Sequence, residues 1–440
     1  MTAVVGILNK RGVAIAADSA VTRTRTDETK VTKNGNKMVR VSNAVPISVM
    51  ITGSADYLGN PWDLVVRCYR KDRGDVAHST VKECVLDFFD YISSNDQLWN
   101  SDIVDYYIAD TLRKLFSTTR KAVDEGSDFA KKLRSSNNYT TSPAYIRAFI
   151  RELKRLQAES LAGGICPQFE GYTIESFKDY AQNIIEKWVV EITETSKSKY
   201  VYPKSFISDI LETLQQTLFL SLTTRTNSVN GFTQKSSELI FTGYGSEQDY
   251  PSLVATKVGA GLENRVNYHI RKEDIVSISD EIPAAICPFA QTDISKAIVE
   301  GVHKTLFHIV GRELKSSLDP DNSILFDGEQ TDLVFKEMLS EVKIDNLLQN
   351  MTKSVARKGK KNQQEWVMKL KDYDLKAMAM LAESMIELTG FHRILNFQQE
   401  GVGGLIDLAV ITKNDGFTWL NRKSWYGGKD VNGQYGRLGV

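Results

Sequence analysis

The chain has 440 residues, and its 55 Lys and Arg balance its 55 Asp and Glu, so that the formal net charge is zero. This balance argues against a global electrostatic attraction to nucleic acid or to acidic membranes. Hydrophobic residues make up 42% of the chain, which is enough for a large core and excludes wholesale disorder.

The two ends of the chain and a segment near residue 240 are predicted to form strands. Residues 2–8 (TAVVGIL) and 13–19 (VAIAADS) are apolar runs joined by NKRG, which indicates a hairpin, and their near-continuous apolar character predicts that both sheet faces are covered. Residues 22–30 (TRTRTDETK) are polar and predict a turn, and strands follow at 37–42 and 46–54. Further strands are expected at 237–245 and 252–260, and at 405–420 around an Asp-Gly turn.

Helical periodicity dominates between residues 61 and 230, and the apolar positions of 101–116 fall on one helix face. Further helices are expected from Pro143, over 172–192 and 205–222, over 293–314 and over 374–395. The basic run at 353–371 is interpreted as a solvated loop and helix face rather than a nucleic-acid site, which would need more aromatic residues and a wider patch.

The cysteines and the N-terminus bear on the cellular compartment. Cys68, Cys84, Cys166 and Cys287 show no CxxC spacing and are expected to be buried, reduced thiols. The N-terminus lacks the basic and leucine-rich regions of a signal peptide, and no apolar run reaches the about 18 residues of a membrane span. We therefore expect a cytoplasmic protein with no membrane contact.

Thr2 becomes a nucleophile and base in one residue if Met1 is removed, because its hydroxyl then lies beside a free α-amine. An α-amine with a pKa of about 7.7 is roughly 40% free base at about pH 7.5, whereas an ordinary lysine is only about 0.1% free base. No propeptide is expected before Thr2, so removal of the methionine alone would activate it.

Four ordered segments resemble the start of a proteasome β-subunit. They read T-A-V-V-G-I at 2–7, G-V-A-I-A-A-D-S at 12–19, K-N-G-N-K-M-V-R-V at 33–41 and I-T-G-S at 51–54, and residues 403–417 resemble the closing hairpin of such subunits. The chain thus resembles the N-terminal nucleophile (Ntn) hydrolase superfamily, which also includes the HslV peptidase, over less than half of its length.

The resemblance implies an α+β fold, a four-layer αββα sandwich, with large helical insertions. The Ntn core would comprise residues 1–60 and 235–425, with a helical insertion at 61–234 and a second helical expansion at 313–390. It further implies a threonine-type peptidase that acts on a peptide or protein substrate without a cofactor or metal. Family members form rings, so a homo-oligomer is expected, and an unfoldase partner stays open.

Site residues follow from the resemblance by position. Thr2 falls on the nucleophile, Asp18 on the acid that orients the catalytic lysine, Lys37 on that lysine, and Gly53 on the oxyanion donor. Residues that would bind substrate are Thr22, which falls on the threonine that pairs with its backbone, and Val21, Ile51 and Ala55, which would form apolar pocket walls.

The sequence departs from the family pattern in two places. Where the family carries a further Asp and Ser near the last hairpin, this chain has Gln399 and Val402, with Glu400 as a neighbouring acid. The family's mid-chain serine would fall near AAICPFA at 284–290, which contains no serine.

Alternative interpretations stay open. Thr2 could be an ordinary strand residue, and Gly53 a turn glycine with positive φ. The whole chain could be a non-catalytic, proteasome-like scaffold or interaction protein, or a small-molecule amidase of the Ntn class. His303 and His308 are five residues apart, off the i, i+4 spacing of helical zinc sites, so a metal is not expected.

Overall fold

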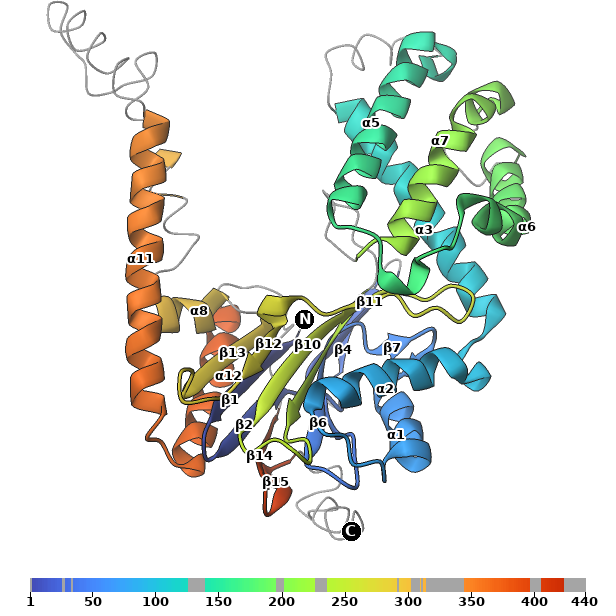
Figure 1. The fold of residues 1–440 in the computed structure, drawn as a ribbon. Helices are drawn as coiled ribbons and strands as arrows, with labels where there is room; N and C mark the ends of the chain where they lie inside the picture. The colour runs from blue at the N-terminus through green and yellow to red at the C-terminus, as the bar shows by residue number, and fades with distance from the viewer. Residues whose placement is uncertain are drawn as a thin grey trace, which may run out of the picture. The chain divides into compact units, whose positions relative to one another are not determined.

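The computed structural model describes residues 2–25, 28–32, 35–125, 139–194, 202–225, 236–290, 293–301, 309, 312–313, 344–395 and 405–422. The fold is α+β (Figure 1). The chain divides into two compact units, the first made of Met1–Thr52, Thr242–Ser252 and Val276–Val440, and the second of Gly53–Phe241 and Leu253–Ile275.

A five-stranded antiparallel sheet forms the centre of the first unit. Its strand order is β13 (Ala284–Ala290), β1 (Ala3–Asn9), β2 (Gly12–Asp18), β14 (Ile406–Thr412) and β15 (Gly416–Asn421). The predicted hairpins β1–β2 and β14–β15 are confirmed. Every residue of β1 and β2 is buried, which confirms the prediction that both faces are covered.

Helices cover one face of this sheet. They are α8 (Asp293–Glu300), α11 (Ile344–Leu370) and α12 (Leu375–Leu395), which Figure 1 shows beside the sheet. Alternate residues of β1 and β2, including Val5, Ile7 and Ala14, form one buried cluster with Met378 and Met385 of α12. The small alanines of β2 leave room for the helix to approach the sheet.

The side chain of Asn9 joins the end of β1 to the turn between α11 and α12. Its amide nitrogen donates to the backbone carbonyls of Leu370 and Tyr373, at 3.0 and 2.9 Å. Its carbonyl oxygen accepts from the Arg11 amide, which also fixes the β1–β2 turn. The buried Asn9 amide thus holds the turn before α12 against the end of β1.

The polar segment predicted as a turn forms a strand pair instead. β3 (Val21–Arg25) and β4 (Glu28–Thr32) pair antiparallel, with Thr24 opposite Thr29. Threonine is β-branched and favours extended backbone, so the alternating Thr-Arg pattern forms strands although it carries no apolar stripe. Farther along, β5 (Met38–Arg40) pairs with β6 (Ile47–Gly53), and β12 spans Ile275–Ser277.

The second unit contains the predicted helical region. Its helices are α1 (Trp62–Arg73), α2 (Val81–Ser94), α3 (Ser101–Glu125), α5 (Pro143–Ala162), α6 (Ile174–Glu194) and α7 (Lys204–Thr223). Its strands are the hairpin β7 (Asp56–Tyr57) and β8 (Asn60–Pro61), most of β9 (Ser237–Gly243) and β10 (Ser252–Val258), and β11 (Tyr268–His269). Short 3-10 turns lie at Asp96–Leu98, Tyr139–Thr141, Pro167–Phe169 and Lys272–Asp274.

Aromatic side chains form the core between α3, α5 and α7. Phe116, Phe149 and Phe206 are all buried, with the ring of Phe149 at 5.3 Å from Phe116 and 5.5 Å from Phe206. Aromatic pairs at such distances contribute beyond the area that they bury. Within the described ranges, no helix combines the length and apolar character needed to cross a membrane.

Candidate active site

A buried ion pair joins two of the predicted site residues. The Lys37 ammonium lies 2.6 Å from Asp18 Oδ1, and the two side chains are only 6% and 0% exposed. Asp18 is the last residue of β2, and Lys37 comes directly before β5. A charge-assisted hydrogen bond in such a dry environment holds both side chains in one geometry.

The same carboxylate also binds the backbone beside Thr2. The Ala3 amide donates to Asp18 Oδ1 at 2.9 Å, and the Ala20 amide donates to Oδ2 at 3.3 Å. Thr2 itself is half-buried and lies directly before β1. The structure therefore brings the backbone at Thr2, the Asp18 carboxylate and the Lys37 ammonium together around one shared hydrogen-bond acceptor.

The backbone around this centre is further tied down. The Ser19 hydroxyl donates to the Leu405 carbonyl at 2.7 Å, and the Gly35 amide donates to the Ser19 carbonyl at 3.0 Å. The Ile51 amide donates to the Lys37 carbonyl at 2.8 Å. These backbone hydrogen bonds hold the main chain next to Asp18 and at Lys37 in place, and so position the two side chains of the ion pair.

The residues predicted to bind substrate have different placements. Val21 and Thr22 belong to β3, and Ile51 is a buried residue of β6. Ala55, by contrast, is exposed and belongs to the second unit.

Gly53, the predicted oxyanion donor, ends β6 and also belongs to the second unit. Its φ is +79°, and a Cβ built there would lie 2.4 Å from the Ser236 carbonyl oxygen. Local backbone geometry alone therefore requires glycine at this position.

The positions that depart from the family pattern are only partly described. Gln399, Glu400 and Val402 lie outside the described residues, as do His303 and His308. The segment AAICPFA forms strand β13, where Cys287 is paired with Gly6 of β1. This strand was not predicted from the sequence pattern.

Asp407 is a buried carboxyl group that sequence analysis did not single out. It is 2% exposed on β14, opposite Ala17 of β2 and one residue beyond Ile406, the partner of Asp18. Its neighbour Leu408 packs in the cluster with α12, so alternation places Asp407 on the opposite face of the sheet. The signal in the sequence was an acidic residue inside the apolar run LIDLAV.

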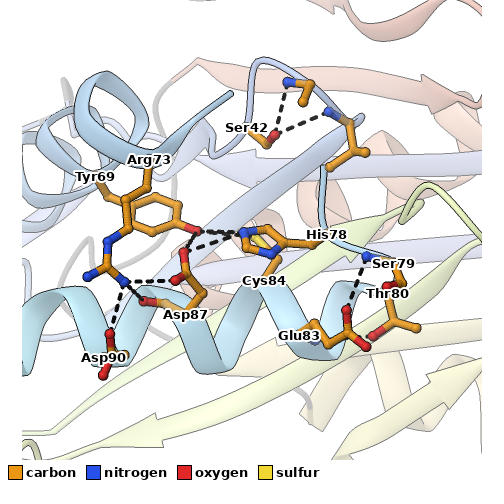
Figure 2. Close-up of polar contacts among 12 residues, drawn as sticks. Ser42, Tyr69, Arg73, His78, Ser79, Thr80, Glu83, Cys84, Asp87 and Asp90 are labelled. Atoms are coloured by element: carbon orange, nitrogen blue, oxygen red, sulfur yellow. Dashed lines mark hydrogen bonds and ion pairs between the residues drawn. The ribbon is translucent and has the colours of Figure 1, made fainter. Parts of the chain in front are cut away.

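A second polar network lies between α1 and α2 (Figure 2). The Tyr69 hydroxyl donates to Asp87 at 2.7 Å and lies 3.1 Å from His78 Nε2, while Arg73 donates to the other Asp87 oxygen at 2.7 Å. Burial raises the pKa of the adjacent Cys84 thiol to about 12, so at neutral pH it is not a thiolate nucleophile. We interpret this network as the polar link that holds α1 against α2.

The candidate metal ligands among the described residues are scattered. All four cysteines are free thiols, with Cys84 and Cys166 buried and Cys68 and Cys287 half-buried. In the described part of the chain, no three or more His, Cys, Asp or Glu side chains are grouped so that they could hold a metal ion.

We compared the chain with protein-family models, curated proteins and solved structures. No protein-family model matches the chain, and no curated protein matches it. Among solved structures, the chain is similar to the Anbu (Gly-1) mutant from Hyphomicrobium sp. strain MC1, with 9% sequence identity over 100% of this chain and 95% of that one. The TM-score of this alignment is 0.27, which does not establish a shared fold.

Proposed function

We propose that the protein is a threonine-nucleophile amide hydrolase, a proteasome-like peptidase of the Ntn class with a four-layer αββα core. The observation that carries the proposal is the Asp18 carboxylate, which binds the Lys37 ammonium at 2.6 Å and the Ala3 amide at 2.9 Å, directly beside Thr2. A fixed buried cation next to a candidate nucleophile is the arrangement that such chemistry needs.

Each residue has a physical role in the proposed reaction. The free α-amine of Thr2 accepts the proton of its own hydroxyl, and the alkoxide attacks the substrate carbonyl. Lys37, kept charged and oriented by Asp18, stabilises the developing negative charge. The Gly53 amide is the proposed donor to the tetrahedral oxyanion, and loss of such a donor costs about 100- to 1,000-fold in rate. When the tetrahedral intermediate collapses, the C–N bond breaks and the protonated α-amine of Thr2 returns its proton to the leaving amine. Water then hydrolyses the acyl ester on Thr2, which releases the acid and restores the hydroxyl.

The proposal requires Thr2 to be the first residue of the mature protein. A peptide epoxyketone tests this, because it forms a ring only with both the hydroxyl and the free α-amine of the same residue. Intact mass after incubation should show loss of Met1 and one adduct, and the Thr2→Ala variant should show no adduct.

Other outcomes distinguish the alternatives. A retained methionine without an adduct would contradict catalysis and favour a scaffold role. If Thr2 forms the adduct and the protein cleaves small amides but no fluorogenic peptide, the result would favour an amidase. Light scattering of the same sample tests the proposed homo-oligomer, because a monomer would contradict it.

A further inference from the structure

A small cavity lies entirely within the second unit, where the β7–β8 hairpin meets α3 and the end of β10. Its volume is about 160 Å³. The residues that line it do not include Val21, Thr22, Ile51 or Ala55, which are the proposed substrate-binding residues. The cavity is therefore lined by a different set of residues, although Ser54 in its wall lies between Gly53 and Ala55 in the chain.

Tyr57 lines this cavity and is a buried side chain with an unused polar atom. It is 3% exposed, and its ring packs against Trp62 and Trp99 at centroid distances of 5.2 and 6.0 Å. Its hydroxyl has no hydrogen-bond partner among the described residues, and burial raises its pKa well above the ordinary value. A buried hydroxyl without a partner destabilises a fold, so a ligand that binds it would explain its presence.

Tyr107 places a second buried hydroxyl next to the first. Its oxygen makes no well-aligned hydrogen bond in the described structure, although Thr111 and the Ala260 backbone lie close to it. Tyr57 and Tyr107 line the same cavity, and the nearby Tyr107 phenol contributes to the raised pKa of Tyr57. The cavity wall thus carries two buried phenol oxygens, and that of Tyr57 has no hydrogen-bond partner among the described residues.

Asp110 adds a negative charge on the same face of α3. Ile103, Tyr107 and Asp110 follow the i, i+4, i+7 spacing that brings side chains to one side of a helix, and all three line the cavity. Asp110 interacts electrostatically with Tyr107 and forms an ion pair with Lys114 at 2.7 Å. Asp56 lines the cavity as well, and the lining therefore carries acids but no basic residue.

The remaining wall is apolar and small. Leu58, Ile103 and Val258 provide aliphatic surface, and Gly59 and Gly259 leave the space open. An ammonium group has three N–H donors and no acceptor, which matches two phenol oxygens and one carboxylate. A short alkyl chain attached to it would fit the aliphatic wall.

We propose that this cavity binds a protonated primary amine on a short alkyl chain. The ammonium donates to Tyr57, Tyr107 and Asp110, and the alkyl chain contacts Leu58 and Ile103. The same chemistry occurs in a free diamine and in a lysine side chain presented by another protein.

Calorimetric titration of the full-length protein with 1,4-diaminobutane and with N-acetyl-lysine amide tests the proposal and separates the two sources. Binding of either amine, with no binding of 1-butanol, is expected. Asp110→Asn should weaken binding about tenfold or more, because it removes a charge-assisted hydrogen bond. Asp102→Asn, on the same helix but outside the cavity, should change binding by less than about twofold.

The Tyr57→Phe variant should change amine affinity and thermal stability in different directions. The variant keeps the ring but removes the unpartnered hydroxyl, so affinity for the amine should fall while the Tm of the ligand-free protein stays equal or rises. If neither amine binds at millimolar concentration, or if Asp110→Asn and Asp102→Asn bind equally well, the proposal is overturned.

Discussion

At the scale of single residues, the loss of either partner of the Asp18–Lys37 ion pair should lower stability, because both charges are buried. Removing one member of a buried ion pair leaves the other charge without compensation, which typically costs about 3–5 kcal/mol. Lys37→Met should therefore lower the free energy of unfolding by about that amount, measured by urea denaturation. The double variant Asp18→Asn/Lys37→Met should recover most of the loss.

An exposed ion pair of the same length provides the control. Lys204 lies 2.6 Å from Glu194, but the two side chains are 76% and 52% exposed. Lys204→Met should cost less than about 1 kcal/mol, because solvent screens the interaction. If Lys37→Met and Lys204→Met lower the unfolding free energy equally, burial does not determine the strength of the Asp18–Lys37 ion pair.

His269 should make the stability of the protein depend on pH. Burial, assisted by Lys257, Arg225 and Arg271, lowers the pKa of His269 to about 4, against a weaker opposite effect of Asp274. Between pH 4 and 6.5 the unfolded chain binds more protons at this residue than the folded chain, so stability rises with pH there and falls as the solution is acidified.

The size of this effect can be measured directly. Acidification from pH 6.5 to pH 5 should cost about 1.5 kcal/mol of unfolding free energy through His269 alone. His269→Gln should remove that part of the slope in urea titrations at both pH values. A variant with the same slope as the parent protein would show that His269 is not its source.

At the scale of elements, two glycines with similar positive φ allow the cost of backbone strain to be distinguished from the cost of a steric clash. Gly53 and Gly416 have φ values of +79° and +74°. A Cβ at Gly53 would lie 2.4 Å from the Ser236 carbonyl oxygen, whereas at Gly416 it would meet nothing within 4 Å. Gly416→Ala should cost about 1 kcal/mol from φ alone.

Gly53→Ala should cost clearly more than Gly416→Ala, because the end of β6 must shift as well. Thermal unfolding of both variants measures the difference. Equal losses would show that the backbone at Gly53 relaxes freely, which would weaken its proposed role as a rigid oxyanion donor.

Elements with a clear hydrophobic pattern were predictable from sequence, and polar or isolated ones were not. β1 and β2 are largely apolar runs around a short turn, and α12 places Met378, Ala382 and Met385 at helical spacing on its buried face. β3 and β4 have no apolar stripe, and β13 contains a proline inside a run of seven residues. β3 and β4 pair with each other although no apolar pattern marks them, and β13 pairs with β1 at the far end of the sequence, which local pattern does not reveal.

The candidate site shows the same limit. The Asp18–Lys37 contact followed from a resemblance and not from spacing, because 19 positions and a strand pair separate the two residues. The Tyr57 and Tyr107 hydroxyls and the Asp407 carboxyl could not be singled out from sequence, since what distinguishes them is burial. Burial of one side chain is a property of the assembled fold.

At the scale of the whole molecule, the two compact units raise the question of how cooperatively the chain unfolds. The domain organisation proposed from sequence, with residues 61–234 inserted into a discontinuous core, predicts that the helical part has its own stability. The buried cluster around Phe149, with Phe116, Tyr145 and Phe206, gives that part an aromatic core of its own.

Phe149→Ala tests this directly. Removing a fully buried phenylalanine typically costs about 3–5 kcal/mol, through lost transfer energy and the cavity left behind. If the helical part unfolds separately, hydrogen exchange should accelerate in α3, α5 and α7, while β1 and β2 keep their protection. Leu161→Ala, which truncates an exposed residue on the same helix, is the control. Equal loss of protection in β1 and β2 would show that the chain unfolds as one unit, and the proposed insertion would then be part of the core.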